Sequence, residues 1–370
     1  MKTKQIRWSS KNGWEKGNEL VDADLVLAFA DDGFFQTADC YAQLNERFPQ
    51  AHIVGCSSSG SVLDTGISDD DVVVTAVKFE QGRVRVAVAD LGGGAEVSEL
   101  GASLMAELKA DDLRHVFVLS DGMQVNGSEL AKGLNQAGVA VTGGLAGDGT
   151  RFGKTWVMAD GLAVAGRIVA VGFYGELTVK SGCFAGWQEF GAERVVTKSV
   201  GNVVYEIDHQ PALELYKKYL GEQAAGLPGT GLRFPLSIQE TKQEKALIRT
   251  LLAVDESAHS LTFAGDVPQG YLCKLMRTNL DSLIDNAGLA AEAAQPTSSN
   301  ATGLCLVVSC VGRRLVLGQL TEDELEIVRE NLGENTAITG FYSYGELAPF
   351  SDILQCQLHN QTMTLTTIYE

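Results

Sequence analysis

Proline is scarce in this chain, and paired cysteines are missing from its sequence. The 370 residues include 7 prolines against 41 glycines, so we expect glycine-rich turns rather than rigid linkers to separate the elements. The seven cysteines are odd in number, form no C-x-x-C pair and mostly lie in apolar runs. This pattern indicates reduced, buried thiols and no disulfide framework.

Long apolar runs and excess positive charge are absent as well. No stretch approaches the roughly 18 consecutive apolar residues of a membrane helix, and the start MKTKQIRWSS lacks the apolar core of a signal peptide. The 29 basic residues face 47 acidic ones, which gives a formal net charge of -18 at pH 7. Such a charge repels nucleic acid and anionic membranes at long range. We therefore expect a cytoplasmic protein whose partners are small molecules or other proteins, with no nucleic acid and no membrane among them.

The length and the hydrophobic content fit two domains. With 45% hydrophobic residues, a chain of 370 residues can bury one or two real cores. Residues 221–235 (GEQAAGLPGTGLRFP) are rich in glycine and proline and show little periodicity. We place the junction at the start of this segment, between a first domain of residues 24–220 and a second of residues 221–370.

A short motif, A[V/I]TG, occurs at residues 140–143 and again at 337–340, each time in front of an irregular loop. Each copy follows a predicted strand and a predicted helix, and a third, weaker copy ends in HIVG at residues 52–55. This repetition predicts an α/β fold of two related domains, with mixed sheets, flanking helices and duplicated strand, helix, strand, loop and hairpin units whose loops converge on related surfaces. The predicted strand, helix and strand of the three units are 24–30, 33–47 and 52–55; 117–120, 126–136 and 140–143; and 305–309, 321–331 and 337–340.

Sequence patterns outside these units predict hairpins, helices and further strands. Apolar residues on both sides of short turns indicate hairpins, and Pro211 can begin a helix where its missing donor costs nothing, with Gly221 as the C-cap. The predicted hairpins are 72–79 with 83–89, 154–158 with 162–172, and 353–358 with 363–368; two more helices are 96–110 and 270–294; two more strands are 194–198 and 202–207.

The stretch 339–349 (TGFYSYGELAP) is the strongest candidate for a binding loop. A β-prone run is broken by a glycine, after which Tyr342 and Tyr344 lie at the end of a strand and Gly345 frees the backbone beside Glu346. Large rings and one acid at one place suit a small ligand, and Glu346 would accept a ligand ammonium or orient a tyrosine hydroxyl. The alternative is an aromatic core cluster capped by a surface acid, because aromatic residues are normally buried for packing.

No catalytic or metal-binding pattern stands out. Residues 56–60 (CSSSG) resemble a nucleophile elbow, but that motif needs glycine where Cys56 stands, and no order of serine, histidine and acid can be argued. The loop 144–149 (GLAGDG) lacks the Gly-Lys-Ser/Thr of a phosphate loop. The five histidines have neither an i, i+4 partner nor a paired cysteine. We therefore expect a binding protein rather than an enzyme, with a hydrolase as the weaker alternative.

Six segments of the chain are distinctive: HIVGCSSSG (52–60), GGLAGDG (143–149), FGAERVVTKSVGNVVYEID (190–208) with PALELYKKYLG after it, LMRTNLDSLIDNA (275–287), SCVGRRLVLG (309–318) and GFYSYGELAPF (340–350). Together they resemble the paired N- and C-terminal FIST domains, from about residue 24 onward. The resemblance implies an intracellular sensory protein that binds a small ligand and acts on a separate signalling partner. A free-standing chain of this size also resembles the nitric-oxide-sensing branch, which implies haem as the ligand and a histidine kinase as the partner. A colourless amino-acid sensor is the alternative.

Further candidate ligand residues lie in loops and among polar groups of apolar segments. Arg277 and Asn279, placed on the predicted helix 270–294, and Arg313 could hold a carboxylate; the alternative for them is a structural role, such as salt bridges for Arg313. For the haem that the resemblance implies, His209 is the first candidate ligand, since it precedes the helix that begins at Pro211 near the predicted junction. The remaining candidates for the ligand site are Cys56, Ser57, Ser58, Gly144 and Asp148.

Overall fold

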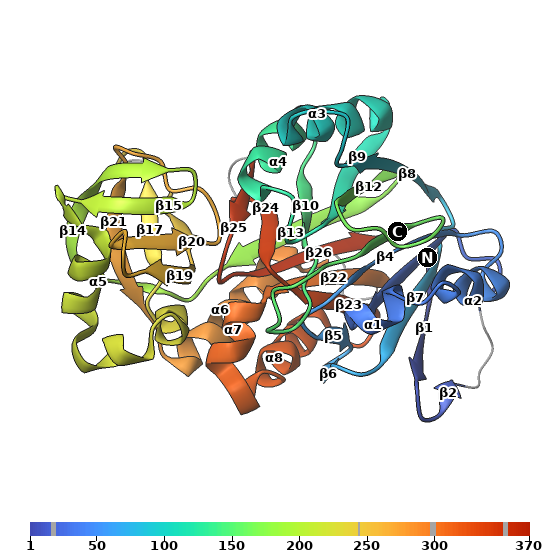
Figure 1. The fold of residues 1–370 in the computed structure, drawn as a ribbon. Helices are drawn as coiled ribbons and strands as arrows, with labels where there is room; N and C mark the ends of the chain where they lie inside the picture. The colour runs from blue at the N-terminus through green and yellow to red at the C-terminus, as the bar shows by residue number, and fades with distance from the viewer. Residues whose placement is uncertain (16–19, 243–244, 297–300, 351–353) are drawn as a thin grey trace.

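Three pairs of parallel strands form the centres of three six-stranded sheets in the computed structural model, which describes residues 1–15, 20–242, 245–296, 301–350 and 354–370 (Figure 1). Helices connect the first strand of each pair to the second, because parallel neighbours need a crossover. The pairs coincide with the three predicted units, and the α/β fold of mixed sheets is confirmed. The units are β3 (Leu25–Ala30), α1 (Asp32–Phe35), α2 (Cys40–Arg47) and β4 (His52–Ser57); β9 (Leu113–Ser120), α4 (Gly127–Leu134) and β10 (Val141–Leu145); and β22 (Gly303–Cys310), α7 (Val311–Leu317), α8 (Asp323–Leu332) and β23 (Thr336–Ser343).

Two antiparallel strands complete each sheet beside the first strand of its parallel pair, so the three sheets share one topology. We call the three sheets and their helices the body. The antiparallel strands are β7 (Val72–Lys78) and β1 (Lys2–Ser9); β12 (Arg167–Gly175) and β8 (Gly82–Asp90); and β26 (Met363–Tyr369) and β13 (Thr178–Phe184), and the short edge strands are β2 (Gly13–Trp14), β6 (Gly66–Ser68) and β25 (Cys356–His359).

The strand that follows each parallel pair leaves its own sheet and joins a neighbouring one. β5 (Ser61–Leu63) follows β4 but pairs with β23, β11 (Val157–Ala159) follows β10 but pairs with β4, and β24 (Gly345–Pro349) follows β23 but pairs with β10. The three units therefore exchange strands in a closed cycle. Consequently their loops meet inside the body, where the Ser59 N–H donates to the carbonyl of Tyr342 at 2.9 Å and the Gly147 N–H donates to that of Ser57 at 3.0 Å.

One glycine in each unit explains the repeated motif. Gly55, Gly143 and Gly340 lie on the second parallel strand of their units, opposite Ala28, Val118 and Val307 on the first. A Cβ at the three glycines would lie 2.2, 2.0 and 1.9 Å from the carbonyl oxygens of those partners. Because a backbone carbonyl in a sheet cannot move aside, only glycine fits at these positions.

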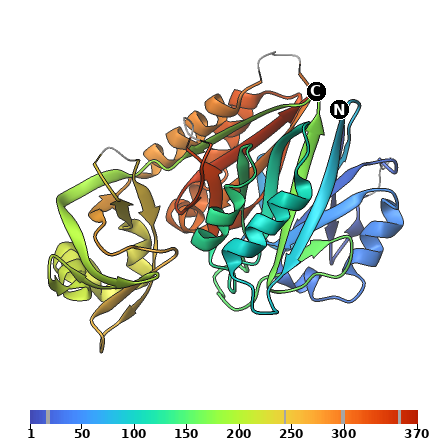
Figure 2. The ribbon, with the colours of Figure 1, turned by 90° about the horizontal axis from the view of Figure 1, so that it is seen from above.

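Both faces of the parallel strands in each sheet are buried. The inner faces share one core, in which Phe29 stacks on Phe341 with ring centroids 5.1 Å apart. The outer faces are covered by helices, seen from above as the blue, teal and orange groups around the body (Figure 2). Burial on both faces explains the continuous apolar runs of the parallel strands. The covering helices are α1 and α2; α3 (Val97–Leu108) and α4; and α6 (Leu280–Ala294) and α8.

Residues 188–277 form a separate antiparallel lobe with its own core, inserted between β13 and α6 (Figure 1). The segment near residue 220, where the sequence indicated the domain junction, lies inside this lobe. Pro211 is the N-cap of its helix and Gly221 the C-cap, as predicted. The lobe contains β14 (Gln188–Val200), β15 (Val203–Ile207), β16 (Gln210–Pro211), α5 (Ala212–Leu220), the 3₁₀ helices η1 (Gly221–Gly226) and η2 (Gly229–Arg233), β17 (Leu236–Gln239), β18 (Leu247–Arg249), β19 (Leu251–Asp255), β20 (Ser260–Phe263) and β21 (Leu272–Arg277).

Two of the predicted hairpins, 72–79 with 83–89 and 353–358 with 363–368, are wrong, because the two strands of each belong to different sheets. Of the third, 154–158 with 162–172, a single antiparallel bridge between Val157 and Val164 forms. β7 and β8, β11 and β12, and β25 and β26 are consecutive along the chain, yet each strand pairs elsewhere. A short turn between apolar strands fits a crossing between packed sheets as well as it fits a hairpin. Residue 353, the predicted start of the last hairpin, lies outside the described residues.

Two predicted helices also differ from the structure. The helix predicted over 270–294 begins only at Leu280, because residues 272–277 form β21 and Asn279 caps the helix. Residues 33–47 contain two short helices, α1 and α2, in place of one.

Candidate functional site

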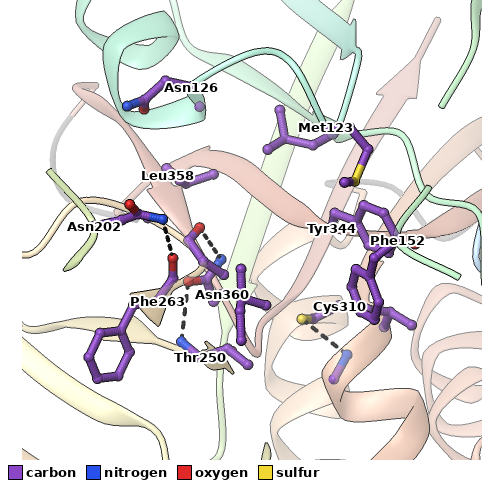
Figure 3. Close-up of a pocket in the computed structure, with 18 of the residues that line it drawn as sticks. Met123, Asn126, Phe152, Asn202, Thr250, Phe263, Cys310, Tyr344, Leu358 and Asn360 are labelled. Atoms are coloured by element: carbon purple, nitrogen blue, oxygen red, sulfur yellow. Dashed lines mark hydrogen bonds between the residues drawn. The ribbon is translucent and has the colours of Figure 1, made fainter. Parts of the chain in front are cut away.

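A cavity of about 530 Å³ lies between the lobe and the body (Figure 3). The body contributes the loop before α4, the end of β10, the turn between β23 and β24, the start of α7 and the end of β25. The lobe contributes the turn between β18 and β19 and the end of β20. Its wall includes Met123, Asn126, Phe152, Asn202, Thr250, Leu252, Gly265, Asp266, Cys310, Leu315, Tyr344, Leu358 and Asn360.

Large apolar side chains surround this cavity and remain accessible to solvent. Met123, Phe152, Leu252 and Leu315 are 41, 42, 41 and 40% exposed. Phe152 stacks on Tyr344 with ring centroids 4.8 Å apart. Exposed apolar clusters beside a cavity are typical of sites that a ligand or a partner covers.

Tyr344 forms part of the wall, and Asp148 holds it there. The Tyr344 hydroxyl donates to the Asp148 carboxylate, which also accepts from the backbone N–H groups of Phe152, Gly153 and Lys154 at 2.8–2.9 Å. Burial opposes ionisation of Asp148, but these donors lower the pKa of its carboxyl below the usual value. Burial raises the pKa of the Tyr344 phenol, which keeps it a donor. The pair therefore fixes both the ring and the loop after β10.

Polar groups on the lobe side face the body across the boundary. The Asn202 amide donates to the carbonyl of Phe263 at 2.7 Å, and the Asn126 amide donates to the Asp266 carboxylate at 3.2 Å. Thr250 is 4% exposed, and its hydroxyl has no hydrogen-bond partner among the described residues. A buried hydroxyl without a partner, in a residue that lines a cavity, is a candidate donor for a ligand.

Glu346 is fully buried and lies outside the lining of the cavity. Its carboxylate accepts from the hydroxyls of Ser343 at 2.6 Å and Thr362 at 2.9 Å, and from the Thr362 N–H at 3.1 Å. Burial raises the pKa of Glu346 to about 7, because desolvation outweighs these donors. The side chain is therefore placed to hold the turn between β23 and β24 rather than to contact a ligand directly.

Arg313 and Tyr342 belong to a buried network that involves no cavity. Arg313 and Glu324 are both 0% exposed, and the guanidinium donates to that carboxylate at 2.8 and 3.1 Å. The Tyr342 hydroxyl donates to the same carboxylate at 2.7 Å, and Arg313 also donates to the carbonyls of Ala185 and Leu283. The network joins α6, α7, α8 and β23, so its role is structural.

Three further predicted residues lie away from the cavity wall. Arg277 is an exposed residue of β21 whose guanidinium lies over the ring of Phe190, and Asn279 caps α6 by accepting from the Ser282 N–H at 2.7 Å. His209 is exposed in a tight turn of the lobe, with φ of 58°.

The serine loop after β4 lies next to a second cavity. Cys56 and Ser57 are fully buried, and Ser58 borders this second cavity, of about 660 Å³. The Ser58 hydroxyl contacts that of Ser61 at 2.9 Å, which gives it no histidine partner of the kind a hydrolase nucleophile needs. Gly144 and Gly345 pack behind the wall, where a Cβ would lie 2.5 Å from Val308 and 2.8 Å from Leu358.

The loop before α4 and the lobe residues on the wall are absent from the residues predicted from the sequence. The loop follows β9 as CSSSG follows β4, so the repeat could have indicated residues 121–127. No sequence signal could have indicated Asn202 or Thr250, because they are single polar residues beside ordinary strands.

The described residues include few side chains that could hold a haem or a metal ion. They contain no cluster of three His, Cys, Asp or Glu side chains that could hold a metal. No histidine lines the cavity: His115 and His359 are buried elsewhere, where desolvation lowers their pKa values to about 3 and about 4. The cavity atoms that could ligate iron are those of Met123, Cys310 and Tyr344. Burial raises the pKa of the Cys310 thiol, which disfavours the thiolate, and the Tyr344 hydroxyl is held by Asp148. The cavity therefore does not fit a haem bound through His209.

All seven cysteines are free thiols, as predicted, and six of them are buried. In the described parts of the chain, no helix is both long and apolar enough to cross a membrane.

Comparisons with known proteins cover almost the whole chain. The FIST N domain matches residues 24–210, and the FIST C domain matches residues 212–349. An uncharacterized protein of Methanocaldococcus jannaschii, MJ1623, is 23% identical, over 99% of this chain and 78% of its own length. A chorismatase crystal structure aligns with 100% of this chain and 98% of its own, at 10% identity and a TM-score of 0.36, which is too low to support any argument about function.

Proposed function

Because this chain belongs to the FIST family, whose domains are sensory domains that bind small ligands in signalling, we propose that the cavity between the lobe and the body is its ligand site. The observation that carries the proposal is the group of four half-exposed apolar side chains on the wall, Met123, Phe152, Leu252 and Leu315. Contact with water is unfavourable for these apolar side chains, whereas the apolar part of an organic molecule would cover them.

The proposed signal is a change in how the lobe sits on the body. Six hydrogen bonds between described residues cross this boundary, at 3.0–3.5 Å. Side chains make three of them: Arg249 donates to the Leu358 carbonyl, Gln361 to the Leu232 carbonyl and Asn126 to Asp266. In the other three, the Thr250 and Asp266 N–H groups donate to the side chains of Asn360 and Ser128, and the Asn360 amide donates to the Ala264 carbonyl. A ligand that contacts both sides adds contacts only in one arrangement of the lobe, and so stabilises that arrangement. A separate intracellular signalling protein, such as a histidine kinase, would read the difference.

The ligand that the wall favours is a colourless organic metabolite. A cavity of about 530 Å³ with an apolar wall could hold a molecule as large as haem. Haem, however, needs an axial ligand, and the wall supplies only Met123, Cys310 and Tyr344, under the restrictions described above. Nitric-oxide sensing through haem is therefore the second candidate.

The absorption spectrum separates the two candidates. Protein produced with added haem precursor should show no Soret band, while metabolites that raise its melting temperature should identify the ligand class. A Soret band that shifts with nitric oxide would establish the haem alternative.

A pair of leucine variants tests the location. Leu252→Glu places a negative charge on the cavity wall and should weaken ligand binding by at least about 10-fold, since burying an unpaired charge is costly. Leu289→Glu is the matched control, because Leu289 is 42% exposed on α6 and does not line the cavity. Equal affinities of the two variants for a ligand that binds the wild-type chain would rule out the cavity as its site.

A further inference from the structure

Arg249 is a buried cation at the boundary between the lobe and the body. It is 3% exposed, and its guanidinium donates only to main-chain carbonyls, those of Asp266 at 2.9 Å and of Ile248 and Leu358 at 3.0 Å. No carboxylate of a described residue forms an ion pair with it, and the Asp266 carboxylate attracts it only at longer range. Desolvation outweighs this attraction and lowers the pKa of Arg249 to about 10, so the group is still charged at neutral pH. A buried charge with no carboxylate in direct contact is expensive, and it favours an anion placed nearby.

The guanidinium lies directly behind the cavity wall. Gly265 belongs to that wall, and a Cβ on this glycine would lie 3.0 Å from Nε and 3.2 Å from Cζ of Arg249. The next residue along the chain, Thr250, lines the cavity, and its buried hydroxyl has no partner in the described structure. A residue with an unpaired hydroxyl thus follows directly after a buried cation that forms no ion pair with a described residue.

We propose that the ligand of this cavity carries a carboxylate, which accepts a hydrogen bond from Thr250 and is attracted by the charge of Arg249. This inference rests on the proposed function, because it names the class of ligand for the same site. The apolar remainder of the molecule lies against Phe152, Leu252 and Tyr344. The ligand is therefore an organic monoacid with an aliphatic or aromatic body.

An acidic residue on the wall, Asp266, limits where the carboxylate can lie. Asp266 is the only acid among the described residues that line the cavity, and its Oδ1 accepts from the Asn126 amide at 3.2 Å. Repulsion from Asp266 places the carboxylate on the Thr250 side. One free hydroxyl and one cation suit a singly charged head better than a phosphate dianion, which needs more donors.

The test uses acids and their primary amides as matched probes of the full chain: phenylacetate, 3-phenylpropionate, indole-3-acetate and hexanoate, each with its amide. The amide keeps the shape and removes the charge. Dissociation constants from ligand-observed NMR at pH 7 should favour the acid of at least one pair by about 10-fold or more, because hydrogen bonds to charged groups are the stronger ones.

Thr250→Val should raise the dissociation constant of that acid by about 10-fold while leaving its amide nearly unchanged. The variant should fold normally, because valine has the same shape and the lost hydroxyl has no partner. Thr339→Val is the matched control, since Thr339 also carries a buried, unpaired hydroxyl but lies on β23, outside the cavity. It should leave both constants unchanged.

The outcomes separate this inference from the proposed function. Probes whose binding is lost in Leu252→Glu, but which bind equally as acid and amide or are unaffected by Thr250→Val, would overturn the carboxylate and keep the site. If no probe binds in a way that Leu252→Glu abolishes, both the carboxylate and the site are overturned. Acid preference that Thr250→Val removes and Thr339→Val retains supports the inference.

Discussion

Two buried arginines differ in their hydrogen-bond partners. Arg313 lies inside the body and Arg249 at the lobe boundary. Arg313 meets a buried carboxylate, Glu324, and every hydrogen bond of the pair is made within the body. Arg249 meets only carbonyl oxygens and lies beside a cavity. A completed network joins elements permanently, whereas an incomplete one leaves an interaction for a ligand to supply.

The largest effect is expected from breaking the completed pair. Glu324→Gln should lower the free energy of unfolding by about 3–5 kcal/mol, because it leaves the Arg313 charge buried without a counter-ion. Urea denaturation measures the change. Asp112→Asn is the control, since its pair with Arg83 is exposed and should contribute no more than about 1 kcal/mol. A loss as small as that of the control would show that the network does not join the body.

Glu346 sharpens the comparison, because it is a buried acid with no cation partner. Its pKa is raised from 4.5 to about 7, so its contribution to stability is complete below pH 4.5 and is lost as the pH rises through 7. The free energy of unfolding of the wild-type chain minus that of Glu346→Gln should therefore fall by up to about 3 kcal/mol over this range. Taking the difference removes the opposite contribution of His115 and His359, whose pKa values are lowered. A difference independent of pH would contradict the raised pKa.

The close approach of strands in the body can be tested at Gly143. Gly143→Ala should cost about 1–3 kcal/mol or more, since its Cβ would lie 2.0 Å from the Val118 carbonyl oxygen. Gly92→Ala is a matched control, because both glycines have φ of 143° but nothing lies within 4 Å of a Cβ at Gly92. Equal losses in thermal denaturation would attribute the effect to φ alone.

Tyr344→Phe should cost about 1–2 kcal/mol in free energy of unfolding, because it removes the hydrogen bonds of this hydroxyl with Asp148 and with the Gly149 carbonyl and keeps the ring against Phe152. The three backbone donors to Asp148 remain. No measurable loss would mean that these donors alone hold the loop after β10.

The smallest effect is expected at His209. His209→Ala should change the free energy of unfolding by no more than about 0.5 kcal/mol, because the side chain is exposed in a turn. The absorption spectrum should also stay unchanged. Loss of a Soret band in this variant would restore His209 as a haem ligand.

The residues predicted from the sequence include one wall residue of the body, Tyr344, and no wall residue of the lobe. The sequence indicated Tyr344 and Asp148, because a repeated motif marked the loops that follow the parallel pairs, and the structure brings these two residues together. Arg313 was also predicted to bind the ligand, because it is a polar residue in an apolar segment. Nothing in the local sequence indicated that Glu324 would pair with it. The lobe residues carried no comparable pattern.

The sequence by itself determined the three parallel pairs and their glycines. A strand buried on both faces is a continuous apolar run, and the absence of a Cβ is a property of glycine wherever it occurs. Only the tertiary structure decided which sheet each later strand joins and where the cavity lies. Both depend on contacts between distant parts of the chain, such as Thr250 with Asn360, 110 positions apart, which no local pattern records.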